Sequence, residues 1–286
     1  METEKIRVLL QVLELGTLSA AAEKLGYTPS GLSRSIASLE QETGLTLLIR
    51  ERRGVRPTTA CEEMLPSWRR LLAAQEQADQ ALAALLGLDR GRLRIGSSYG
   101  SYLPMLARLV SEFSRQWPGI RVELFEGTSS ELGDAVADGQ ADLALISRRS
   151  GDFEWIGWKQ EQLMAVLPTS HSLAGESAFP LERFAGESFI EIHPDRETDN
   201  SRLFLQENIV PRRRFSCGDT LAALSMVEVG LGITLVNALL LESWRGNTVA
   251  LPLDPPCLVE IGVACAPKEI RSPAAEKFLS LLRQLS

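Results

Sequence analysis

The stretch TLSAAAEKLGYTPSGLSRSIASLE, residues 17–40, constrains the fold of this chain more than any other. Apolar residues at helical spacing predict one short helix over residues 17–25 and another from residue 29 to about residue 42. Gly26 suits the left-handed backbone that ends the first of them, while Thr28 caps the second and Pro29 opens it. Residues 4–14 predict a further helix, so three helices with tight turns begin the chain.

The helix over residues 29–42 has two different faces. One face carries the apolar residues Leu32, Ile36 and Leu39, and the opposite face carries the polar residues Ser30, Ser33, Arg34 and Ser38. Two helices that cross closely at alanines and are joined by a tight turn are typical of a helix-turn-helix, whose second helix enters the DNA major groove. Hydroxyl and guanidinium groups there donate to phosphates and base edges. The alternative is a structural three-helix bundle with a solvated serine face.

An arginine-rich segment follows this helix. LTLLIRERRGVRPTT, residues 45–59, reads as strand, turn and strand, with four basic residues near the tip, namely Arg50, Arg52, Arg53 and Arg56. The chain has a formal net charge of −7, yet residues 1–60 carry +1 and the remainder −8. A basic hairpin of this kind lies along the DNA backbone or in the minor groove as a wing. The charge distribution therefore favours double-stranded DNA as the partner of the N-terminal part.

The stretch from residue 14 to residue 50 resembles the LysR-type transcriptional regulators. An alanine pair, the T-P-S-x-x-S turn, L-E, a glycine and L-x-x-R stand at that family's offsets. Leu48, the Pro57-Thr58 pair, Cys61 and Asn237 depart from its usual residues. The resemblance implies a winged helix-turn-helix over residues 1–58. Together with the polar face and the basic tip, it gives these DNA-binding residues: Thr28, Pro29, Ser30, Ser33, Arg34, Ser38, Arg50, Arg52, Arg53 and Arg56.

A long linker helix is predicted over residues 59–88. Its apolar positions alternate three and four residues apart, as in a coiled-coil seam, and comprise Leu71, Ala74, Ala78, Ala81, Leu85 and Leu88. We expect a homodimer or homotetramer that presents paired recognition helices to an inverted-repeat site. A core helix of a larger domain is the alternative.

From residue 92 onward, strands alternate with helices, which predicts parallel α/β sheets. The strands and helices divide into two subdomains, one over residues 92–161 and 266–286 and the other over residues 162–265, within an effector-binding domain over residues 89–286. A chain that crosses twice between two sheets makes a clamshell like that of periplasmic binding proteins, and the family resemblance implies the same form. The expected fold class is thus a multidomain α+β and α/β protein.

A small-molecule site is predicted in the crevice of this clamshell, because ligands of open α/β sheets lie beyond the carboxyl ends of the strands. Several of these ends precede helices, whose free N–H groups suit an anion, and Arg148 and Arg149 add positive charge. The expected ligand is a small anionic effector. Each Ser or Thr there has the alternative role of an ordinary helix cap. The predicted effector-binding residues are Ser97, Ser98, Tyr99, Thr128, Ser129, Ser147, Arg148, Cys217 and Asp219.

Other features of the sequence narrow the function. Four scattered cysteines form no metal-like pattern, and the longest apolar run, residues 230–241, is too short to span a bilayer. We expect no cofactor, no metal and no membrane partner, a cytoplasmic location, and RNA polymerase as a further candidate partner. Residues 195–199 are expected as a charged loop leading into a helix. An α/β enzyme with an N-terminal dimerisation module is the alternative function, but no nucleophile elbow, phosphate loop or metal cluster is present in the sequence.

Overall fold

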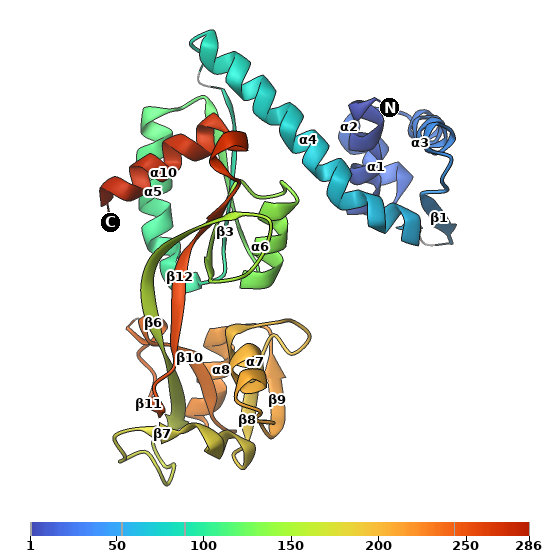
Figure 1. Cartoon of the computed structure of the whole chain (residues 1–286). Helices are drawn as coiled ribbons and strands as arrows, with labels where there is room; N and C mark the ends of the chain where they lie inside the picture. Colours follow the sequence, from blue (N-terminus) through green and yellow to red (C-terminus); the bar gives the residue numbers. More distant parts are fainter. Residues whose placement is uncertain (1, 53, 89, 243, 286) are drawn as a thin grey trace. The chain divides into compact units, whose positions relative to one another are not determined.

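The computed structural model describes residues 2–52, 54–88, 90–242 and 244–285, and the chain forms two compact units (Figure 1). The N-terminal unit extends to Leu85, and the C-terminal unit begins at Leu86. Each unit has a hydrophobic core of its own.

The N-terminal unit has the winged helix-turn-helix arrangement that the sequence predicts. Ala21 and Ala22 are almost completely buried, which allows α2 to approach its neighbours closely. Left-handed glycines end the first three helices at Gly16, Gly26 and Gly44. The elements are α1 (Thr3–Leu15), α2 (Leu18–Leu25), α3 (Pro29–Thr43), β1 (Leu48–Glu51), β2 (Gly54–Pro57) and α4 (Thr59–Leu85).

Hydrogen bonds anchor the wing hairpin to the helices at two points, one near its tip and one at its base. The N–H of Val55 donates to the carbonyl oxygen of Gly16 at 2.8 Å, which ties β2 to the end of α1. The Glu40 carboxylate on α3 accepts from the N–H groups of Leu47 and Leu48, at 2.7 and 3.3 Å. The glutamate of the L-E pair therefore fixes the approach to β1, and the wing is part of the same rigid body as the three helices.

The linker helix α4 is shorter than predicted, because it ends at Leu85 rather than at residue 88. Gly87 follows in the left-handed region with φ of 69°. The first half of α4 packs Cys61, Trp68 and Leu72 into the N-terminal core. The second half has little cover within this chain, and the predicted seam positions Leu71, Ala74, Ala78, Ala81, Leu85 and Leu88 are all exposed.

The C-terminal unit contains two subdomains with separate cores. The first core is built around Leu93, Phe113 and Phe278, and the second includes Phe184 and Phe204. The elements in chain order are β3 (Gly91–Ser97), η1 (Gly100–Tyr102), α5 (Leu103–Gln116), β4 (Ile120–Glu126), α6 (Ser129–Ala137), β5 (Leu143–Ser147), β6 (Glu154–Pro168), β7 (Phe179–Pro180), η2 (Leu181–Ala185), β8 (Phe189–Ile192), α7 (Asp199–Gln206), β9 (Arg213–Cys217), α8 (Thr220–Glu228), β10 (Thr234–Asn237), α9 (Ala238–Leu241), β11 (Thr248–Asp254), β12 (Leu258–Cys265), η3 (Lys268–Ile270) and α10 (Pro273–Leu285).

Two long antiparallel strands, β6 and β12, run through both subdomains (Figure 1). β6 pairs with β12 along its first part and with β10 and β11 along residues 163–168. Residues 261–265 of β12 pair with β5 in the first subdomain, although the predicted bounds placed them in the second. The two subdomains are joined by a pair of continuous strands, as a clamshell requires.

The prediction of parallel sheets was only partly correct. β3 is parallel to β4 and β5, and β8 is parallel to β9, as expected from helical crossovers between them. β12, β10 and β11, however, pair antiparallel with β6, so the main sheet is mixed. The strand order in it is β4-β3-β5-β12-β6-β11-β7, with β10 also on β6. The sequence pattern missed β11 and the first half of β6.

Gly54 in the wing should not tolerate a side chain. Its φ is 149°, and an added Cβ would lie 2.3 Å from the carbonyl oxygen of Gly16. We expect Gly54→Ala to lower the free energy of unfolding by about 2 kcal/mol or more, since both the strain and the clash must be relieved. Urea unfolding followed by circular dichroism measures this. Gly175→Ala is the matched control, because its Cβ would meet no atom within 4 Å, and equal costs for the two variants would contradict the close approach.

Candidate functional site

The predicted DNA-binding residues of α3 form one polar surface at its N-terminal end. Thr28, Pro29, Ser30 and Arg34 are exposed, whereas Ser33 and Ser38 are half-buried. The Thr28 hydroxyl caps α3 by accepting from the N–H of Gly31 at 3.1 Å. Because the cap fixes the first turn, the side chains of this turn project from a helix end that is already formed.

The wing adds basic side chains next to this surface. Arg50 on β1 donates through Nη2 to the Ser33 hydroxyl at 2.8 Å, so the wing and α3 contact each other through two predicted DNA-binding residues. Arg56 pairs with Glu51 across the hairpin at 2.6 Å. The side chains of Arg34 and Arg52 are exposed and make no hydrogen bond or ion pair with the part of the chain that the structure describes. Arg53 lies outside the described residues.

A cavity of about 140 Å³ lies between the two subdomains of the C-terminal unit. Ser98, Tyr99, Thr128 and Ser129 line it from the first subdomain, at the ends of β3 and β4. The second subdomain contributes residues that precede or open α7 and α8 and residues of β10, including Thr198, Asp199, Asn200, Thr220 and Asn237. The N-termini of α6 and α8 both border this cavity, and their first N–H groups carry partial positive charge.

Two of the predicted effector-binding residues, Thr128 and Asp219, also cap helices. Thr128 and Glu131 exchange hydrogen bonds at the start of α6, at 2.9 and 3.3 Å. The Ser129 hydroxyl donates to Ser98 Oγ at 2.9 Å, and Asp219 caps α8 by accepting from Ala222 N–H at 2.8 Å. The alternative that the sequence left open, ordinary capping, thus applies to Thr128 and Asp219. These groups hold the helix ends in place around the cavity.

Five of the predicted residues lie away from the 140 Å³ cavity. Ser147 and Arg148 line a second cavity of about 340 Å³, where Arg148 is exposed and pairs with Glu260 at 2.9 Å. Ser97 and Asp219 line a third cavity, of about 410 Å³, which shares Ser98 and His193 with the first. Cys217 lines none of these three cavities, and its thiol lies 3.2 Å from the carbonyl oxygen of Asp219.

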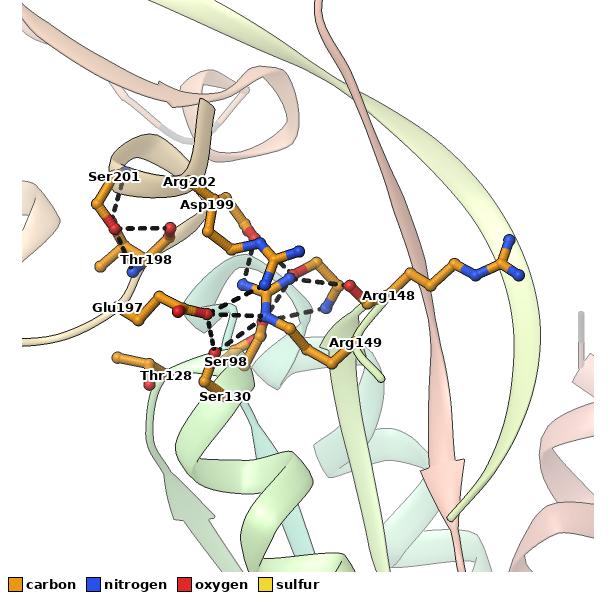
Figure 2. Close-up of polar contacts among 12 residues, drawn as sticks. Ser98, Thr128, Ser130, Arg148, Arg149, Glu197, Thr198, Asp199, Ser201 and Arg202 are labelled. Atoms are coloured by element: carbon orange, nitrogen blue, oxygen red, sulfur yellow. Dashed lines mark hydrogen bonds and ion pairs between the residues drawn. The ribbon is translucent and has the colours of Figure 1, made fainter. Parts of the chain in front are cut away.

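The strongest polar contact between the subdomains is an ion pair that sequence reasoning missed. Arg149 Nη2 donates to Asp199 Oδ1 at 2.8 Å, and the two side chains are only 7% and 15% exposed. Ser147 and Tyr99 donate to the same carboxylate, and Figure 2 shows the Arg149–Asp199 pair. Asp199 lines both the 140 Å³ and the 340 Å³ cavities, so this cluster stands between them.

The electrostatics of the cluster keep Tyr99 neutral. Burial raises the pKa of the Tyr99 phenol far above its ordinary value, and the negative charge of Asp199 raises it further. Next to it, the hydrogen bond from the Ser130 hydroxyl and then that from Arg202 lower the pKa of Glu197. Near neutral pH the Tyr99 phenol therefore keeps its proton and donates it in a hydrogen bond, and the Glu197 carboxyl group is ionised.

Two further lining residues are unusual. The Nδ2 group of Asn237 is buried and has no hydrogen-bond partner among the described residues, although the neighbouring Asn200 Nδ2 donates to Leu235 O at 2.8 Å. His193 has a positive φ of 54°, which is uncommon for a residue other than glycine. Asn237 was singled out from the sequence only as a departure from the family pattern, and no local signal marks His193.

Comparison with known protein families accounts for nearly the whole chain. The model described as LysR substrate binding domain matches residues 86–286. The model described as bacterial regulatory helix-turn-helix protein, lysR family, matches residues 3–62. The chain belongs to the LysR family. It is a LysR-type DNA-binding transcriptional regulator with a substrate-binding domain, which confirms the resemblance and the fold class inferred from the sequence.

Individual relatives agree with this assignment. The HTH-type transcriptional regulator YvbU of Bacillus subtilis is 25% identical over 100% of this chain and 99% of its own length. The regulator CbbR of Sinorhizobium medicae is 30% identical over 83% of this chain and 77% of its own. The crystal structure of CbnR, a LysR family transcriptional regulator, has the same fold, with a TM-score of 0.63 at 23% identity over 99% of both chains.

The alternative of an enzyme receives no support from these comparisons, since the matched family consists of transcriptional regulators. Among the described residues, no three His, Cys, Asp or Glu side chains come together in a group that could hold a metal ion. In the same part of the chain, every helix is too short or too polar to cross a bilayer.

Replacing each of the two asparagines of the cavity by leucine should affect the free energy of unfolding differently. We expect Asn200→Leu to cost about 1 kcal/mol in the free energy of unfolding, because the carbonyl oxygen of Leu235 loses its donor. Asn237→Leu should leave stability unchanged or raise it, because the buried Nδ2 that it removes has no partner. Urea unfolding of the two variants beside the wild type measures the difference, and a larger loss for Asn237→Leu would contradict this assignment.

Proposed function

We propose that this LysR-type regulator binds an inverted-repeat promoter site as an oligomer, and that a small anionic effector in the subdomain cleft changes this binding. The observation that carries the proposal is the joint surface of α3 and the wing. Its basic and hydroxyl side chains are exposed or half-buried, and the Arg50–Ser33 hydrogen bond holds its two parts together. As a regulator of promoters, the protein acts in the cytoplasm.

On DNA, the N-terminal end of α3 enters the major groove, and the wing lies along the backbone. Ser30, Ser33 and Arg34 contact base edges and phosphates, while Arg50, Arg52 and Arg56 neutralise phosphate charge. The opposite side of α3 cannot take this role, because Leu32, Ile36 and Leu39 are buried in the N-terminal core.

The second half of α4 is the contact between two chains. Leu82 and Leu85 are 57% and 86% exposed in the single chain, and Leu86, directly after the helix, is 66% exposed, which leaves a large apolar surface in contact with water. Pairing of α4 with its copy in a second chain buries this surface and brings two winged domains into one particle. A two-fold particle matches an operator with inverted half-sites.

The effector occupies the 140 Å³ cavity, where small hydroxylated side chains meet the N-termini of α6, α7 and α8. Oxygen atoms of an anion there accept from backbone N–H groups at the starts of α6 and α8, and from the unpaired Nδ2 of Asn237. Because the lining comes from both subdomains, binding changes the free energy of closing the clamshell, and this change is coupled to DNA binding.

Removal of the polar side chains at the centre of the DNA-binding surface should weaken binding. We expect the double variant Ser33→Ala, Arg34→Ala to bind the DNA upstream of its own gene at least about tenfold more weakly, with a salt dependence reduced by about one phosphate contact. Electrophoretic shifts at several salt concentrations measure both quantities. Arg115→Ala removes an arginine that is 75% exposed in the C-terminal unit and should leave binding unchanged. Undiminished binding by a folded, oligomeric double variant would refute the assignment.

Charges placed on the exposed stripe of α4 should separate the chains. We expect Leu71→Glu, Leu85→Glu to shift the protein toward a monomer, because four carboxylates would face one another in each pair of helices. Analytical ultracentrifugation measures the mass. Ile270→Glu, at a side chain that is 58% exposed in the C-terminal unit, is the control and should remain oligomeric. A double variant that keeps the wild-type mass would show that α4 does not hold the chains together.

A further inference from the structure

Three side-chain donors surround the carboxylate of Asp199, as donors in a binding site surround a bound anion. Its Oδ1 accepts from Arg149 Nη2 and the Ser147 hydroxyl, and its Oδ2 accepts from the Tyr99 phenol. The three donors come from the ends of β3 and β5 in the first subdomain, whereas Asp199 opens α7 in the second. One subdomain thus supplies the donors, and the other supplies the anion.

Two of the donors, Arg149 and Ser147, also make hydrogen bonds within the first subdomain. Arg149 also donates to Ser147 Oγ at 2.6 Å, to Ser130 Oγ at 3.0 Å and to its neighbour's backbone carbonyl at 3.0 Å. Ser147 is 1% exposed and its N–H donates to Ser129 Oγ at 3.1 Å. The guanidinium therefore stays in place when Asp199 moves away.

A guanidinium fixed at this depth requires a negative partner. Burying an unpaired charge costs much free energy, and charge-assisted hydrogen bonds to a carboxylate usually offset this cost. Glu197 is a weaker candidate, because its oxygen lies 3.8 Å from Arg149 and its side chain is 53% exposed. When the clamshell opens and takes Asp199 with it, a small anion from solution satisfies the same three donors.

We infer that Tyr99, Ser147 and Arg149 form a carboxylate-binding site that Asp199 occupies from within the chain, and that the carboxylate of an effector binds there in its place. This inference rests on the effector role proposed above for the cleft and names the chemical group that is recognised. The site borders both cavities through Asp199, so the remainder of such a ligand has room on either side. Exchange of the two carboxylates breaks a contact that holds the subdomains together, and ligand binding is thereby linked to closure.

The test uses formate as the smallest carboxylate probe and the full-length chain. In Asp199→Ala the site is empty, and sodium formate should raise the melting temperature more than sodium chloride does at the same ionic strength. The formate Kd obtained from this concentration dependence should be at least about tenfold lower than for the wild type, in which Asp199 competes. Asp195→Ala, which removes an exposed carboxylate from the same loop, should behave as the wild type does.

A second change identifies the site. Adding Arg149→Gln to Asp199→Ala should abolish the specific effect of formate. If Asp199→Ala fails to fold, Asp199→Asn keeps the side-chain volume, removes the charge and should still bind formate more tightly than the wild type. Formate affinities in the alanine or asparagine variant equal to that of the wild type, or an effect that survives Arg149→Gln, would overturn the inference. DNA binding by the same variants reports separately on the proposed function, because formate binding requires no DNA.

Discussion

The antiparallel pairing of β6 with β12 is the constraint on which the C-terminal unit depends. β6 is 15 residues long and belongs to both subdomains, with β12 along its first part and β10 and β11 along its second. Since these strands are continuous through the junction, the ends of β3 and β5 are held opposite the start of α7. The cavity and the Arg149–Asp199 ion pair both lie at this junction. The chemistry of the cleft is therefore a consequence of one strand pairing.

The helical part of the fold could be predicted from the sequence because its signals are local. Gly16, Gly26 and Gly44 each end a helix with φ close to 70°, and Thr28 and Pro29 begin α3 as expected. Strand direction depends instead on partners far away in the chain, which is why the mixed sheet was not foreseen. The first half of β6, EWIGWKQEQ, is largely half-exposed and shows no regular alternation. β11 was overlooked because it contains Pro252, and a proline argues against a strand since it has no N–H to donate to the sheet.

The candidate site, like the fold, could be predicted from the sequence only in part. Small residues at strand ends and helix starts pointed to the cleft, and Ser98, Tyr99, Thr128 and Ser129 do line the 140 Å³ cavity. Asp199 could not be recognised as a partner of Arg149, because the two residues are 50 positions apart in the sequence. In addition, carboxylates are common in the first turn of a helix, where the helix dipole stabilises them, so Asp199 did not stand out. Arg148 was chosen over Arg149 because neighbouring arginines look alike in a sequence. The fold separates them, exposing Arg148 and burying Arg149.

The hydrogen bond between Arg50 and Ser33 has a consequence for the energetics of recognition. A long arginine side chain in solution samples many rotamers, and a partner that immobilises it must offset that loss of entropy. In the free protein, Arg50 is already restrained against α3, and the wing is held at its base by Glu40 and near its tip by the carbonyl oxygen of Gly16. The duplex therefore meets a preorganised surface, on which most of the ordering took place when the domain folded.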